Sequence, residues 1–185
     1  MIDLIKSMFK LNVLINAMLF NGVWIACVAG SAKQLLWPAI ASVAVLAAYQ
    51  LHPQNRHPND IKLVIASVVL GIIVDTIWVK AGYMDFTDKR PFSNFAPAWI
   101  VVLWVGFALT VNHSLKWLTA HPLLPVITGA VAAPITYFAG IKLGAVVYTQ
   151  SVTTVSVGLA IAWSISLTIL VKIGQRSITE TPESS

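Results

Sequence analysis

About six long apolar segments follow one another along this chain, each close to the roughly 20 residues that an α-helix needs to cross a bilayer. Hydrophobic residues make up 57% of the 185 positions and charged residues only 10%, whereas a soluble domain carries about 25% charged residues. Because the charge deficit is concentrated in these segments, the sequence predicts an all-α, polytopic membrane helical bundle. The predicted spans are Leu11–Gly30, Gln34–Leu51, Ile61–Val79, Pro97–Trp117, Pro122–Ala139 and Thr154–Ile173.

The spans leave no room for a sizeable soluble domain. We therefore expect one membrane domain over residues 1–176 and a short polar, disordered tail over residues 177–185. The stretch Gly140–Ser151 is compatible with either a longer fifth helix or a loop. No internal repeat is evident, so the repeat signature of many transporters is not predicted.

The basic residues are dispersed between the spans, which argues against nucleic-acid binding despite a net charge of +5. With the N-terminus in the cytoplasm, the cytoplasmic side carries seven of them: Lys6, Lys10, Arg56, Lys62, Lys116, Lys172 and Arg176. The outer side carries five: Lys33, Lys80, Lys89, Arg90 and Lys142. This small excess of inner charge predicts that both termini are cytoplasmic.

Asp75 is the only carboxylate within the predicted spans. An ionised Asp near the bilayer centre costs roughly 2.5–3.5 kcal/mol, so such residues usually face a bundle interior or a wet cavity. In the predicted topology Asp75 lies about 21 Å along its helix, in the outer third of the membrane. We predict an outward-facing pocket in which Asp75 binds a ligand or exchanges a proton. The other candidate residues for this pocket are Asn21, Trp78, Trp104, Tyr137 and Lys142.

A purely structural interpretation of the same residues stays open. Asp75 would then hold helices together through Thr76, Asn21 or Lys142, and the aromatic residues would serve as anchors at the membrane interface.

The four histidines, His52, His57, His113 and His121, fall at the cytoplasmic side in this topology, with Asp60 nearby. Their spacing is wider than the dense HxxxH and HxxHH patterns of membrane iron enzymes. We expect solvated interfacial histidines, with no metal and no cofactor. The sequence also lacks the GxSxG, P-loop and HExxH motifs, and whether the protein is an enzyme stays open.

A series of short elements resembles the small bacterial inner-membrane proteins of domain-of-unknown-function family 2878. The elements are Asp75–Trp78, Pro97–Trp99, Leu103–Ala108, Ser114–Leu118, Gly129, Pro134–Gly140 and Leu143–Ala145. The family pattern prefers Gly where this chain has Ala133, and a basic residue, often Arg, where it has Lys142. The resemblance implies a bacterial inner-membrane protein. It also implies a gene context of fatty-acid-modifying methyltransferases and flavin oxidases, which points to lipid metabolism or envelope stress.

Three functional hypotheses follow. The first is a lipid-associated protein that binds a membrane lipid around Asp75 or works with lipid-modifying enzymes as partners. The second is a small proton-coupled transporter that uses Asp75 and acts as a homodimer. The third is a non-catalytic membrane scaffold or assembly partner.

Overall fold

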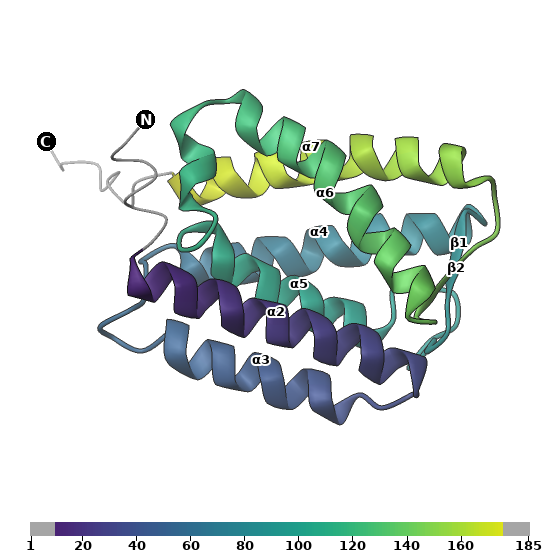
Figure 1. The fold of residues 1–185 in the computed structure, drawn as a ribbon, viewed down its shortest axis with the longest axis horizontal. Helices are drawn as coiled ribbons and strands as arrows, with labels where there is room; N and C mark the ends of the chain where they lie inside the picture. The colour runs from purple at the N-terminus through teal and green to yellow at the C-terminus, as the bar shows by residue number, and fades with distance from the viewer. Residues whose placement is uncertain (1–9, 176–185) are drawn as a thin grey trace, which may run out of the picture.

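The computed structural model describes residues 10–175, and the predicted polar tail lies outside them. Within this part the chain is a bundle of six α-helices with one 3-10 helix and a small two-stranded sheet (Figure 1). The helices are α2 (Leu11–Ala32), α3 (Trp37–Gln50), α4 (Asp60–Lys80), α5 (Ala98–Val111), α6 (Leu123–Lys142) and α7 (Val152–Gln175). The 3-10 helix is η1 (Lys116–Ala120), and the strands are β1 (Met84–Phe86) and β2 (Val146–Tyr148).

Successive helices run in alternating directions and pair as α2–α3, α4–α5 and α6–α7 (Figure 1). Helix α5 lies at the centre and contacts α2, α3, α4 and α7. We call the end of the bundle that carries β1 and β2 the sheet end. The opposite end, where α2 begins and α7 finishes, is called the polar end (Figure 1).

Four helices, α2, α4, α6 and α7, are long and apolar enough to cross a membrane, which indicates a membrane protein. Helices α3 and α5 have 14 residues each, or about 21 Å, against a hydrocarbon core of about 30 Å. The helical class is therefore confirmed, while four of the six predicted spans reach spanning length on their own.

The fourth predicted span, Pro97–Trp117, was too long. Helix α5 ends at Val111, and the chain then turns into η1. The physical reason is that Asn112 and His113 hydrogen-bond Asp60 at the start of α4, so these polar residues leave the apolar helix.

Two glycines end α4 and α6 in the same way. Gly82 and Gly144 have φ angles of 67° and 78°, a left-handed conformation that glycine adopts without steric cost and that commonly terminates helices. The closing hydrogen bonds run from Tyr83 N to Trp78 O (3.0 Å) and from Ala145 N to Gly140 O (2.9 Å). The ambiguous stretch Gly140–Ser151 is thus a helix end, a glycine turn and the strand β2.

The sheet joins two copies of a short repeat that the sequence analysis missed. The segments Lys80–Thr87 and Lys142–Thr149 share Lys, Gly, an aromatic residue and Thr at equivalent positions. β1 and β2 pair antiparallel about Asp85 and Val147. The Thr87 hydroxyl donates to Gly144 O (2.6 Å), and the Thr149 hydroxyl donates to Gly82 O (2.7 Å). These reciprocal bonds give the sheet end a local two-fold symmetry that relates α4–β1 to α6–β2.

Candidate functional site

Asp75 is completely buried between α4, α5 and α6. The Trp104 Nε1–H donates to its Oδ2 at 2.7 Å, and the Tyr137 hydroxyl donates to its Oδ1 at 2.6 Å. Both carboxylate oxygens therefore have a donor, which offsets the cost of burying the group away from water. The site lies in the sheet-end half of α4, which ends at Lys80.

Trp104 reaches Asp75 because α4 has no side chain at Gly71, one turn earlier on the same face. A Cβ atom built on Gly71 would lie 2.3 Å from Trp104 ring carbons. A second contact fixes the backbone, since the Ser67 hydroxyl donates to Trp104 O at 2.9 Å. On its other side the Trp104 ring stacks on Trp163 of α7, with centroids 4.6 Å apart and planes 12° apart.

Trp104 and Tyr137 form part of the wall of a groove of about 550 Å³ between α2, α5, α6 and α7. Asp75 lies behind this wall and does not line the groove. The exposed lining residues Asn21, Ala132 and Ile135 place the opening between α2 and α6. No charged residue lines the groove, and aromatic rings form much of its surface. The aromatic lining residues are Phe20, Trp24, Trp99, Trp104, Phe107, Tyr137 and Trp163.

The remaining predicted site residues lie in different places. Asn21 is at the groove rim, where its amide donates to Ala17 O at 2.8 Å. Trp78 packs against Gly158 and Tyr83, and its buried Nε1 has no hydrogen-bond partner among residues 10–175.

Lys142 is exposed, and its ammonium lies 5.2 Å from the Phe138 ring centroid. It makes no ion pair with Asp75 in the described part of the chain. The structure thus brings Asp75, Trp104 and Tyr137 together, adds Asn21 at the groove rim, and leaves Trp78 and Lys142 outside the groove.

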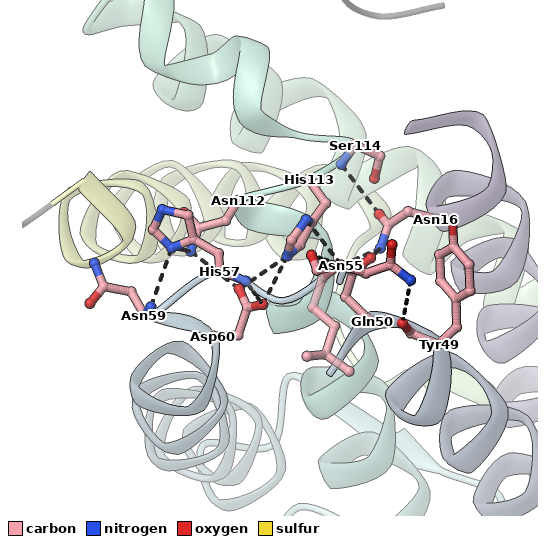
Figure 2. Close-up of polar contacts among 11 residues, drawn as sticks. Asn16, Tyr49, Gln50, Asn55, His57, Asn59, Asp60, Asn112, His113 and Ser114 are labelled. Atoms are coloured by element: carbon pink, nitrogen blue, oxygen red, sulfur yellow. Dashed lines mark hydrogen bonds and ion pairs between the residues drawn. The ribbon is translucent and has the colours of Figure 1, made fainter. Parts of the chain in front are cut away.

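A second group of polar side chains meets at the polar end (Figure 2). We call it the polar cluster; its members are Asn16, Gln50, His57, Asp60, Asn112 and His113. Asp60 is only 1% exposed and accepts from the His57 backbone N–H at 2.7 Å. His113 Nε2 lies 2.9 Å from the same carboxylate oxygen, Oδ2. The Asn112 amide bridges the His57 ring (3.0 Å) and Asp60 (3.3 Å).

The polar cluster extends from Asp60 to α2. Gln50 Nε2 lies 3.1 Å from His113 Nδ1, and Asn16 Nδ2 donates to Gln50 Oε1 at 2.7 Å. The Ser114 N–H in turn donates to Asn16 Oδ1 at 3.3 Å. With Gln50 as donor, His113 Nδ1 accepts and its Nε2–H donates to Asp60, an assignment made from the hydrogen-bond network. Both ring nitrogens are then engaged, so His113 is arranged to hold helices together rather than to take up a substrate proton.

Most of the chain matches a known protein family. A family model described as "Protein of unknown function (DUF2878)" matches residues 13–169. The chain belongs to this family. The matched region of this DUF2878 protein contains Asp75, its two donors and the whole polar cluster. No curated protein and no solved structure matches the chain.

The four histidines of this DUF2878 protein were expected to form one solvated layer. His52 and His121 are indeed exposed, and their rings accept only from nearby backbone N–H groups. His57 and His113 instead meet at Asp60. Residues 10–175 contain no group of three or more His, Cys, Asp or Glu side chains arranged for a metal ion. The signal that pointed to this cluster was the run of polar residues Asn112–Ser114, which interrupts an apolar segment.

Proposed function

We propose that this protein binds a membrane lipid in the groove between α2 and α6. The observation that carries the proposal is a groove of about 550 Å³ with an aromatic lining and no charged lining residue. Small-molecule sites are typically concave, mostly apolar and about 300–1,000 Å³ in volume. The opening between two helices of spanning length favours entry of an acyl chain from the bilayer.

Asp75 supports the groove as a positioning residue. It accepts from Trp104 and Tyr137 and so holds two wall residues in a single arrangement. In this proposal Asp75 acts through the wall, rather than through direct contact with the lipid.

In this proposal, the polar end faces the cytoplasm and the sheet end lies on the outer side of a bacterial inner membrane, which the small excess of basic residues at the polar end supports. The groove would then open into the lipid layer. A lipid-modifying enzyme would be the natural partner, because it would receive or supply the bound lipid.

Mass spectrometry of lipids that co-purify with the protein tests this proposal. Ala132→Phe narrows the groove from its exposed rim, and Ala48→Phe is the matched control on an exposed position of α3 away from the groove. We expect the wild type and Ala48→Phe to retain a discrete lipid that Ala132→Phe loses. Identical bulk membrane lipids in all three proteins would refute the proposal.

A proton-coupled transporter is the second candidate, favoured by one observation. Asp75 and Tyr137 occupy equivalent positions in the α4–β1 and α6–β2 repeats and bond to each other across them. Repeats related by an axis along the membrane normal, with sites at their interface, are common in transporters. If the protein is a proton-coupled transporter, a pH gradient should drive solute flux across the membrane of proteoliposomes, and Asp75→Asn should abolish that flux. The lipid proposal predicts no such flux. A third outcome would favour the scaffold hypothesis: Asp75→Asn alters neither the bound lipid nor the flux, and changes only the stability of the protein or its capture of partners.

A further inference from the structure

The polar atoms of the groove are distributed unevenly along its length. Towards the polar end the groove is lined by three hydroxyl side chains, those of Thr110, Ser114 and Thr128. Towards the sheet end its lining is mostly apolar, and includes Val28, Ile100, Gly140 and Val146. The two hydroxyl side chains in that half are already engaged, since Thr136 donates to Ala132 O and Tyr137 donates to Asp75. A bound amphiphile would therefore be oriented, with its polar group at the hydroxyl side chains and its chain running towards β2.

Two of these hydroxyls are available to a ligand. The Thr110 hydroxyl donates to Phe107 O at 2.6 Å. The Ser114 and Thr128 hydroxyls make no hydrogen bond to any side chain or backbone group within residues 10–175, although both residues are half-buried. A hydroxyl in such a place gains a partner when a ligand brings a hydroxyl or carbonyl oxygen.

The depth at which the groove begins restricts the charge of the ligand. The first lining residue of α2, Ala17, is six residues past the start of the helix, and Thr128 is five residues past the start of α6. At 1.5 Å per residue they lie about 8–9 Å inside the helix ends. An ionised phosphate or carboxylate at this depth would need a cationic partner, and no Lys, Arg or His lines the groove.

We infer that the groove takes a neutral, hydroxyl-bearing single-chain lipid, such as a monoacylglycerol or a long-chain alcohol. Its hydroxyl bonds Ser114 and Thr128, and its chain lies along the aromatic wall. The inference rests on the proposed lipid-binding function and specifies the ligand class. The polar cluster has a positioning role in it, because Asn16 accepts from the Ser114 backbone N–H and so fixes where this hydroxyl lies.

Quenching of tryptophan fluorescence by brominated lipids tests the inference, since four of the seven tryptophans line the groove: Trp24, Trp99, Trp104 and Trp163. The probes are a brominated monoacylglycerol, the methyl ester of the same brominated fatty acid, and a lysophosphatidylglycerol with the same chain. They are titrated into the purified full-length protein in micelles. We expect the monoacylglycerol to bind most tightly.

Removal of both hydroxyls in a Ser114→Ala, Thr128→Val variant should weaken binding of the monoacylglycerol by about 2- to 10-fold for each hydrogen bond lost. Binding of the methyl ester should weaken less, because it offers these side chains a carbonyl oxygen but no hydroxyl group. Thr119→Val, at an exposed position of η1 outside the groove, is the control and should change neither probe.

The failures are distinguishable. If the lysophosphatidylglycerol or the methyl ester binds as tightly as the monoacylglycerol, and Ala132→Phe still blocks binding, the groove binds lipid but the neutral hydroxyl-bearing class is wrong. If Ala132→Phe changes quenching by none of the probes, the lipid groove itself is refuted, and the inference with it.

Discussion

The Tyr137 hydroxyl lies 2.6 Å from Oδ1 of Asp75, although the two residues are 62 positions apart in the sequence. The same 62-residue separation relates the two glycine-terminated segments that pair at the sheet end. The bond therefore joins equivalent positions of two structural repeats. Because Trp104 donates to the other oxygen, a single carboxylate fixes α5 and α6 relative to α4.

Removing either partner of this bond should destabilise the protein measurably. Tyr137→Phe deletes one hydrogen bond. Asp75→Leu leaves two buried donors unpaired, and each unpaired donor should lower the free energy of unfolding by about 1–3 kcal/mol. The free energy of unfolding in mixed micelles measures both effects. In the double variant the effects should be non-additive, with a coupling of about 0.5–3 kcal/mol. Strict additivity would show that the two residues act independently.

Gly71→Ala should displace Trp104 from Asp75. The new methyl group would lie 2.3 Å from the ring, so the indole or the helix must move. This rearrangement should cost about 1–3 kcal/mol of stability. We expect lower stability and a changed tryptophan emission spectrum. Gly22→Ala in α2 is the matched control, because no heavy atom lies within 4 Å of its added Cβ. That variant should be neutral or slightly stabilising. Equal behaviour of the two variants would contradict the proposed packing of Trp104 on Gly71.

The helical class and most helix positions were predictable from the sequence, because apolar length dominates in a membrane protein. Asp75 stood out as the only carboxylate within the predicted spans, and Trp104 and Tyr137 were among its candidate neighbours. Their hydrogen bonds were not predictable, since they depend on how α5 and α6 rotate and on the gap at Gly71. Depth along a helix does not specify which face a side chain occupies, so the sequence could not show that Asp75, Trp78 and Lys142 do not line the groove.

The sheet and the polar cluster depend on contacts between distant segments. Each strand has only three residues, too few for a periodic pattern, and the repeated Lys-x-Gly motif that precedes the strands was the available signal. In the polar cluster, Asp60 is separated from His113 by 53 residues. Single polar residues at segment ends are typical of solvated loops. Only the polar run Asn112–Ser114, which interrupts an apolar segment, was a signal for a buried network, and it did not identify Asp60 as the partner.

Asp60→Ala should be the most destabilising single change at the polar end. It removes the acceptor for the His57 backbone N–H and for the His113 ring. Each donor left unpaired should lower the free energy of unfolding by about 1–3 kcal/mol. Thermal unfolding in detergent measures the loss. His121→Ala, at an exposed histidine of the same end, should change stability by about 0.5 kcal/mol or less. A small effect of Asp60→Ala would mean that the cluster does not hold the helices together.

The loop between β1 and α5 should give the sheet end an acid-dependent stability. Hydrogen bonds from the Arg90 guanidinium, which lies 2.8 Å from one Asp88 oxygen and 2.6 Å from the other, lower the pKa of Asp88 below its ordinary value of 3.8. A lowered pKa in the folded state means that the stabilisation is fully present above pH 3.8 and is lost as the pH falls through the lowered value. Arg90→Gln should therefore lower the melting temperature at neutral pH, and its difference from wild type should shrink in acid.

Lys89→Gln provides the control for this titration, because its ion pair with Asp85 is exposed on both sides and exposed pairs contribute little. A pH-independent difference between wild type and Arg90→Gln would show that Arg90 stabilises the loop through its other bond, to Gln34 O, and not through Asp88.

Cysteine labelling should place the two ends of the bundle on opposite faces of the membrane. Cys27 is buried, and Cys27→Ala provides a background without a native thiol. In it, Lys142→Cys reports on the sheet end and His52→Cys on the polar end, both at exposed positions. The positive-inside bias predicts that a membrane-impermeant thiol reagent added to intact cells labels Lys142→Cys and leaves His52→Cys unlabelled until the membrane is opened. The reverse pattern would invert the topology. Labelling of both from outside would show that α5, with only 14 residues, does not carry the chain across the bilayer between these two positions.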